Sequence, residues 1–297
     1  VKPLPYDRQR VTTTDGDFID LDWLRGGHER AVIMVHGLES STRAPHIQAL
    51  GRTLATDGWD IVAMNFRSCS GESNRLLRSY HSGVTEDLAE MIQAVQERGN
   101  YPDVALVGFS LGGNVLMRYL GEQGGNIAAQ RIRMAAAISV PMDLAGCAEN
   151  FKQPANSFYM KRFLRSLCAK VRVKREIFPD AIDYDAVLKS ENFHDFDGRY
   201  TAPVHGFDSA EHYWHSCSAG PVASQIALPT LLLNAMDDPF LTGTCHVEEI
   251  AECSEHLFAE ISVHGGHVGF VRFGDEGRHY YETRVREFFR DQWEALK

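Results

Sequence analysis

Residues 108–113 read Gly108-Phe109-Ser110-Leu111-Gly112-Gly113. An apolar run precedes this stretch at 104–107, and a helical pattern of apolar residues follows it at 114–122. A Gly-x-Ser-x-Gly motif between a strand and a helix is typical of a sharp turn that exposes the serine as a nucleophile. Ordinary glycine-rich turns share the bare pattern, so it is the flanking strand and helix that favour a nucleophile at Ser110.

The rest of the chain continues the alternation of strands and helices. Short, wholly apolar runs indicate strands buried on both faces, as in a parallel sheet, at 31–35, 61–64, 104–107, 134–140 and 230–233. Apolar residues spaced three and four apart predict helices at 47–56, 86–98, 114–122 and 279–296. Asp15-Gly16, within alternating runs over 10–24, predicts a β-hairpin. We therefore predict an α/β fold, with a mostly parallel, doubly wound sheet flanked by helices.

One segment, 141–223, interrupts this alternation. It lies between two predicted core strands, has no strand–helix repeat and is rich in aromatic and basic residues. We interpret it as an inserted cap, or lid, over the carboxyl edge of the sheet, so that residues 1–140 and 224–297 form the core. Phe158 and Phe163 in this segment are candidates for the wall of a substrate site beneath the cap.

A serine nucleophile needs a general base, and histidine suits that role near neutral pH. The strand-like run 258–263 leads into His264-Gly265-Gly266-His267. His267 lies on the expected loop beyond the glycines, whereas His264 falls at the end of the strand, so we assign the base to His267. The two histidines also raise a metal site as an alternative. No cysteine or carboxylate is spaced to complete one, and we predict neither a metal nor a cofactor.

A carboxylate that orients the histidine is expected after another strand. Asp237-Asp238-Pro239 follows the predicted strand 230–233. We assign the acid to Asp238, because it lies a few residues past the strand and Pro239 fixes the chain just beyond it. Asp237 is the alternative, and otherwise caps the turn or bonds to its own backbone. The chain order Ser110, Asp238, His267 is that of the α/β-hydrolase fold.

The loop His36-Gly37-Leu38-Glu39 follows the strand predicted at 31–35. In this fold, one backbone N–H from that loop and one from the residue after the nucleophile stabilise the oxyanion. We assign these two donors to Leu38 and Leu111, and we interpret His36 as a structural residue.

Composition limits the classes of partner. The chain is 44% hydrophobic, which is enough for a large core, and its net charge of −10 repels the phosphate backbone of nucleic acids. The six cysteines show no paired spacing, no apolar run is long enough to span a bilayer, and residues 1–5 are unlike a signal peptide. We therefore expect a cytoplasmic protein with reduced thiols and no nucleic-acid partner, while no pattern indicates its oligomeric state.

Further motifs resemble the YheT-like α/β-hydrolases, which are bacterial relatives of the eukaryotic abhydrolase-domain lipid hydrolases. The resemblance covers almost the whole chain and is carried by 36–41, 66–75, 80–87, 108–114, 237–240 and 265–270, and in the cap by 203–207, Tyr213 and 217–219. Ser68 departs from the pattern, since the family usually has glycine there.

The resemblance implies a Ser-Asp-His hydrolase that cleaves a small-molecule carboxylic or acyl-lipid ester through an acyl-enzyme. It leaves the acyl chain and head group open. An acyltransferase that uses the same acyl-enzyme is one alternative, and a non-catalytic, ligand-binding member of the fold is another.

Two segments allow two interpretations each. The loop 67–74 and His81 either line the pocket or form buried structure that holds their neighbours. The basic stretch 161–175 is either a cap helix with a solvated charged face, or a segment that contacts an anionic membrane surface weakly or guides an acyl chain.

Overall fold

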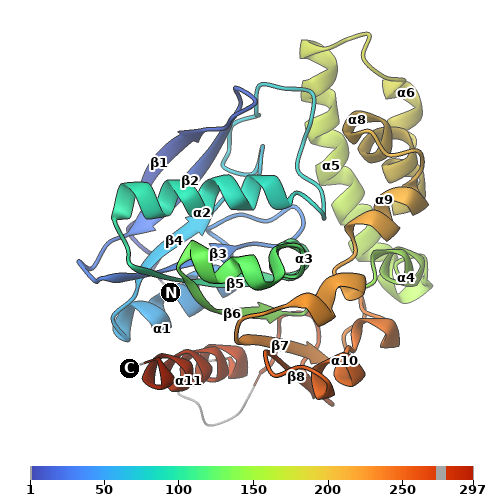
Figure 1. Cartoon of the computed structure of the whole chain (residues 1–297). Helices are drawn as coiled ribbons and strands as arrows, with labels where there is room; N and C mark the ends of the chain where they lie inside the picture. The colour runs from blue at the N-terminus through green and yellow to red at the C-terminus, as the bar shows by residue number, and fades with distance from the viewer. Residues whose placement is uncertain (1, 272–278, 297) are drawn as a thin grey trace.

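The computed structural model describes residues 2–271 and 279–296, and these residues form an eight-stranded sheet. Its strand order is β1-β2-β4-β3-β5-β6-β7-β8, and β2 is antiparallel to both of its neighbours while the remaining pairs are parallel (Figure 1). The strands are β1 (Asp7–Thr12), β2 (Phe18–Leu24), β3 (Arg30–Val35), β4 (Asp60–Met64), β5 (Asp103–Phe109), β6 (Ile132–Ile138), β7 (Thr230–Ala235) and β8 (Leu257–Ser262).

Helices cover both faces of the sheet, because successive side chains of each strand point to opposite faces. Along β3, Ile33 packs into the core shared with α2 (Thr85–Gly99) and α3 (Leu111–Gln123). Its neighbour Met34 packs into the opposite core, shared with α1 (Pro45–Thr56) and α11 (Tyr280–Ala295). Strands with two buried faces are mostly apolar, which explains the continuous apolar runs in the sequence.

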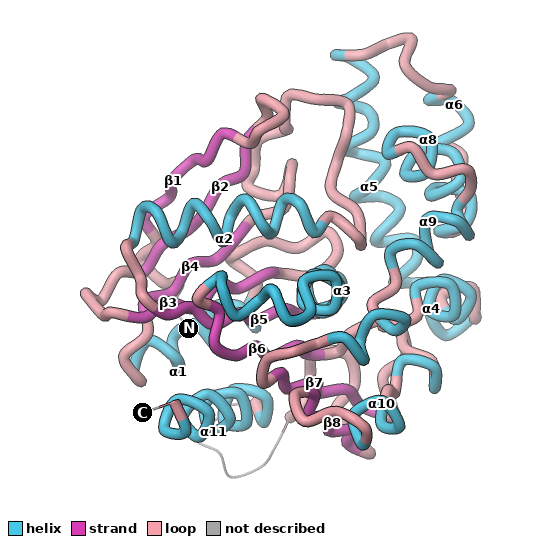
Figure 2. Tube along the Cα trace, in the orientation of Figure 1, coloured by secondary structure: helices cyan, strands magenta, loops and turns pink. Residues whose placement is uncertain are grey.

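The segment between β6 and β7 is helical and lies beyond one end of the sheet, at the upper right of Figure 1. Figure 2 shows no strand in this segment. Its helices are α4 (Leu144–Asn150), α5 (Ser157–Ile177), α6 (Tyr184–Val187), α7 (Phe193–Phe196), α8 (Ala202–His205) and α9 (Ala210–Cys217). Shorter helical turns are Pro154–Asn156, Asp197–Thr201 and Gly220–Gln225 in this segment, with Gly124–Gln130, Gly243–Cys245 and α10 (Glu248–Glu252) outside it.

The predicted, mostly parallel sheet, the alternation of strands and helices along the chain, and the N-terminal hairpin are confirmed. Two strand boundaries were wrong. β8 ends at Ser262, so His264 lies beyond the strand and not at its end, and β6 ends at Ile138, two residues before the predicted end. Ser139 turns the chain out of the strand with a φ of 55°, a conformation that no regular strand contains. Within residues 2–271 and 279–296, no helix is both long and apolar enough to cross a bilayer.

Candidate active site

Ser110 lies at the sharp turn between β5 and α3, with a φ of 53°. The two motif glycines permit this turn because nothing larger fits beside it. A Cβ at Gly108 would lie 2.5 Å from the carbonyl oxygen of Gly112, and a Cβ at Gly112 would lie 2.4 Å from that of His36. Backbone atoms cannot yield as a side chain can, so both positions require glycine.

Three strand ends bring the predicted triad residues together. The Oγ of Ser110 lies 2.9 Å from Nε2 of His267, and Nδ1 of His267 lies 2.8 Å from Oδ2 of Asp238. The Asp238 side chain is fully buried, and its Oδ1 accepts a hydrogen bond from the N–H of Phe240 at 2.9 Å. The ring of Phe240 packs on His267 with 4.5 Å between centroids. This arrangement holds the imidazole between a hydroxyl and a carboxylate.

Asp237 supports the histidine loop from outside. Its Oδ1 accepts hydrogen bonds from the N–H groups of Gly265 and Gly266, both at 2.8 Å, instead of bonding to its own backbone as the sequence suggested. These hydrogen bonds, of which the one from Gly266 has the larger effect, hold the pKa of Asp237 below its usual value. The side chain of His264 is 86% exposed, lies 3.4 Å from Oδ2 of Asp237 and is not part of the cavity lining.

Ser139 also holds the histidine loop, and the sequence carried no signal for it. Its Oγ accepts a hydrogen bond from the N–H of Val268 at 2.9 Å, and its own N–H donates to the carbonyl of Leu233. Val268 has a φ of 63°, so the loop turns sharply just after His267. Ser139 and Asp237 thus fix the loop on both sides of the histidine.

The predicted oxyanion donors flank Ser110. Gly37 packs so closely that a Cβ there would lie 3.0 Å from Cβ of Ser110, and among the described residues no acceptor bonds to the N–H of Leu38. Leu111 begins α3, so its N–H is one of those that a helix cannot pair internally.

His36 is buried and holds the loop that carries Leu38. Its Nδ1 donates to the carbonyl of Gly37 at 2.8 Å, and its Nε2 accepts from the N–H of Phe66 at 3.2 Å. Burial lowers the pKa of His36 to about 3. This neutral ring, bonded at both nitrogens, agrees with a structural role.

A cavity of about 710 Å³ opens above Ser110 and His267. Most of its wall is apolar and comes from the segment between β6 and β7, including Leu144, Phe151, Phe163, Phe193, Trp214 and, from the loop after β7, Phe240. Phe163 lines the cavity as predicted. The prediction for Phe158 was wrong, since its side chain is 70% exposed and lies outside the cavity lining.

One part of the cavity wall is polar. Glu39, with a φ of 49°, accepts hydrogen bonds from the hydroxyl of Tyr80 at 2.6 Å and from Nζ of Lys170 at 2.7 Å, and it also bonds to Ser166. All four residues line the cavity. The loop 36–39 therefore contributes the buried carboxylate of Glu39 to the pocket, in addition to its backbone.

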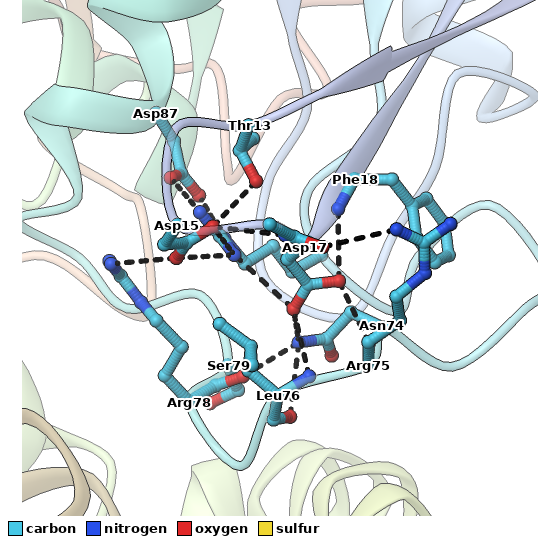
Figure 3. A network of polar contacts seen from close by, with 12 residues as sticks. Thr13, Asp15, Asp17, Phe18, Asn74, Arg75, Leu76, Arg78, Ser79 and Asp87 are labelled. Carbon is cyan, nitrogen blue, oxygen red and sulfur yellow. Dashed lines mark hydrogen bonds and ion pairs between the residues drawn. The ribbon is translucent and has the colours of Figure 1, made fainter.

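The loop 67–78 rests on a buried network of charges (Figure 3). Arg67 pairs with Asp87 of α2 through two bonds of 2.8 and 2.7 Å, and its third nitrogen reaches Asp15 at 3.0 Å. Asp17 accepts hydrogen bonds from Asn74 and from the backbone beyond it. The loop is therefore mainly buried structure that joins the β1–β2 hairpin to α2.

Ser68 shows why this loop favours glycine. It has a φ of 61°, in the left-handed region where glycine carries no penalty. Its Oγ accepts a hydrogen bond from the N–H of Asn74 at 3.0 Å, which compensates in part for the strained backbone. Ser68 and His81 also line the cavity, so this region contributes to the pocket as well.

No cluster of histidine, cysteine or carboxylate side chains able to hold a metal ion occurs among residues 2–271 and 279–296. The six cysteines carry free thiols.

Comparison with known proteins agrees with this architecture. Residues 30–272 match the family model described as the alpha/beta hydrolase fold. The chain belongs to the α/β hydrolase fold family. It is 35% identical to YheT of Escherichia coli (strain K12) over 277 residues, which cover 91% of this chain and 80% of that protein. The resemblance of this α/β hydrolase to the YheT-like members is thus confirmed.

Other relatives of this α/β hydrolase include phospholipase ABHD3 of Mus musculus, which is 28% identical over 91% of this chain and 67% of its own length. The solved structure of the Pyrococcus furiosus esterase Pf2001 superposes with a TM-score of 0.64, covering 97% of this chain and 90% of that one. At 19% identity, that structure supports the fold.

Proposed function

We propose that this α/β hydrolase cleaves carboxylic esters through an acyl-enzyme formed on Ser110. The observation that carries the proposal is the unbroken chain of contacts from Ser110 Oγ through His267 to the buried Asp238, at the floor of an apolar cavity. A hydroxyl so placed loses its proton to the imidazole as it attacks, and the carboxylate stabilises the imidazolium that forms.

The reaction proceeds in two halves. In the first, Ser110 Oγ attacks the ester carbonyl, His267 Nε2 takes the serine proton, and the N–H groups of Leu38 and Leu111 stabilise the oxyanion. The alcohol then leaves with the proton from His267. In the second half, His267 activates a water molecule, which releases the carboxylic acid and restores Ser110.

The substrate is an ester with an apolar acyl chain. The aromatic and aliphatic wall of the cavity suits such a chain, and its volume is within the usual range for small-molecule sites. Among the relatives, one is named a phospholipase and another a monoacylglycerol lipase, and both names denote hydrolases of acyl-lipid esters. We assign the segment 141–223 as the cap of this site, over a core of residues 1–140 and 224–297.

A fluorophosphonate probe tests the assignment, because it reacts with an activated serine hydroxyl. We expect labelling of Ser110 in the wild-type protein and none in Ser110→Ala, together with a loss of ester turnover of about four to six powers of ten. Labelling of a different serine, or full turnover by Ser110→Ala, would refute the proposal. Product analysis with and without an added alcohol separates hydrolysis from acyl transfer, since only transfer yields a new ester.

A further inference from the structure

Helix α5 is strongly basic in an otherwise acidic chain. It contains seven lysine and arginine residues and one acidic residue, Glu176, whereas the chain as a whole has a net charge of −10. Three of its cations bond within the protein: Lys170 pairs with Glu39, Lys174 donates to backbone carbonyls, and Arg175 pairs with Asp185. The remaining four, Lys161, Arg162, Arg165 and Arg172, are exposed and form no ion pair or side-chain hydrogen bond with any described residue.

These four cations share one face of the helix. Residues that are three, four, seven or eleven positions apart lie on the same side of a helix. The four cations have this spacing and form one stripe along α5 between positions 158 and 173. The stripe contains the exposed Phe158 at the N-terminal end and Val173 further along, with exposed fractions of 70% and 39%. The opposite side of α5 packs into the protein through Met160, Leu164, Cys168 and Val171. The outer face is thus basic with apolar positions, and nothing in the described structure covers it.

This face meets the mouth of the cavity. Tyr159 and Arg162 are exposed to solvent, and both also line the cavity. Phe158 packs edge-on against Tyr159 with 5.7 Å between ring centroids, so the exposed apolar side chain adjoins the same rim. A surface that binds the outer face of α5 would therefore lie beside the entrance to the proposed active site.

We propose that the outer face of α5 docks the protein on an anionic lipid bilayer. Cations near such a surface are attracted to its negative potential, and an exposed phenylalanine inserts at the level of the head groups. A nucleic acid fits less well, because the face presents Phe158 and Val173, apolar side chains that insert among lipid head groups but have no counterpart on a phosphate backbone. Docking does not depend on catalysis, but it would bring acyl lipids to the site proposed above.

The test measures sedimentation with vesicles of equal parts phosphatidylcholine and phosphatidylglycerol, using full-length Ser110→Ala protein so that no lipid is hydrolysed. The test variant replaces Lys161, Arg165 and Arg172 with Gln, none of which lines the cavity. Neutralising three cations should weaken binding about 100-fold, which corresponds to about 1 kcal/mol for each. A matched variant replaces Arg98, Arg131 and Arg290, which are exposed elsewhere on the molecule, and should bind like the parent protein.

Three further results bear on the proposal. Binding should be absent on pure phosphatidylcholine, should fall steeply as salt shortens the Debye length from about 10 Å to 3 Å, and should weaken in Phe158→Ala. Equal losses in the test and matched variants would overturn the proposal, as would binding to duplex DNA without binding to vesicles.

Turnover of a water-soluble short ester is measured in protein that keeps Ser110, and the triple substitution should leave it unchanged. If the fluorophosphonate probe fails to label Ser110 in the wild-type protein, the proposed function is refuted, while the docking result, obtained without catalysis, still stands.

Discussion

Asp237 and Asp238 are neighbours in the chain but bond to different parts of the histidine loop. Asp238 contacts the imidazole itself and is shielded from solvent, whereas Asp237 accepts from two backbone N–H groups and keeps 44% of its side chain exposed. The carboxylate of Asp238 can stabilise a positive charge on the imidazole ring, whereas that of Asp237 holds the backbone of the loop in place.

Asp238→Asn should lower ester turnover by about four powers of ten, because the amide neither stabilises the imidazolium nor selects the right tautomer of His267. Asp237→Asn is the matched control. It should keep turnover within about tenfold and lower the free energy of unfolding by roughly 1 kcal/mol, as expected for weakened hydrogen bonds at the surface. Steady-state kinetics and urea unfolding on both proteins decide the matter, and the reverse pattern would move the acid to Asp237.

His36 should make stability depend on pH. Burial lowers its pKa in the folded protein to about 3, from 6.5 in an exposed histidine. As the pH falls through this window, the unfolded chain gains a proton at His36 that the folded protein does not, so the free energy of unfolding decreases by about 1.4 kcal/mol per pH unit. The contribution is fully present above pH 6.5.

Urea unfolding at several pH values between about 7 and 5 measures this slope. His36→Gln keeps a donor and an acceptor but has no titratable ring, so its slope should be smaller by about one proton, whatever its absolute stability. His46, His81 and His205, whose pKa values are also lowered mainly by burial, remain in both proteins and contribute equally to each. An identical slope in the variant would contradict the assignment to His36.

At the scale of elements, α5 offers two phenylalanines with opposite exposure. Phe163 faces the cavity and Phe158 faces solvent, five residues away on the same helix. Shortening Phe163 to Ala removes part of the cavity wall, so it should shift the preferred acyl chain length toward longer esters by changing kcat/KM for long chains more than for short ones.

Phe158→Ala is the control for this change, because it removes the same ring from outside the cavity. On water-soluble esters of graded chain length, its profile should match that of the wild type, since none of these substrates forms a bilayer. If both variants, or neither, alter the chain-length profile, then the wall formed by α5 does not contact the acyl chain.

At the scale of the whole molecule, the network in Figure 3 joins parts of the chain that are far apart in sequence. Arg67 links the β1–β2 hairpin to α2, and Lys174 of α5 donates to the carbonyl of Asn74 at 2.6 Å. Burial lowers the pKa of Lys174 to about 8. The position of the loop 67–78 thus depends on contacts with the β1–β2 hairpin, with α2 and with α5.

Arg67→Met should be strongly destabilising, because the fully buried side chain of Asp87 forms no other side-chain hydrogen bond or ion pair among the described residues, whereas Asp15 and Asp17 keep further donors. An uncompensated buried carboxylate costs about 3–5 kcal/mol in the free energy of unfolding. The double variant Arg67→Met, Asp87→Leu should recover most of that loss, since it removes both charges. A double variant no more stable than Arg67→Met would show that the pair does not act as a unit.

The fold and the order of the candidate site residues were predictable from the sequence. A strand that is buried on both faces requires a continuous apolar run, and a nucleophile turn requires glycines at fixed positions. Both features can therefore be recognised from short stretches of sequence. Ser110 and the region of His267 could be located in this way, as could the two candidate aspartates. Ser139, Glu39 and Lys170 could not, because an isolated polar residue after a strand or on a helix has no pattern of its own.

Contacts between distant segments could not be predicted from local patterns. Which of Asp237 and Asp238 contacts His267 depends on how the loop after β7 meets the loop after β8, and a shift of one residue would exchange their positions. The sequence made Phe158 and Phe163 equal candidates for the cavity wall, since both are aromatic and lie on one helix. The packing of that helix places Phe163 in the cavity wall and leaves Phe158 exposed to solvent. Local spacing determines which elements form, whereas the direction of a side chain near an element's edge depends on neighbours contributed by the rest of the chain.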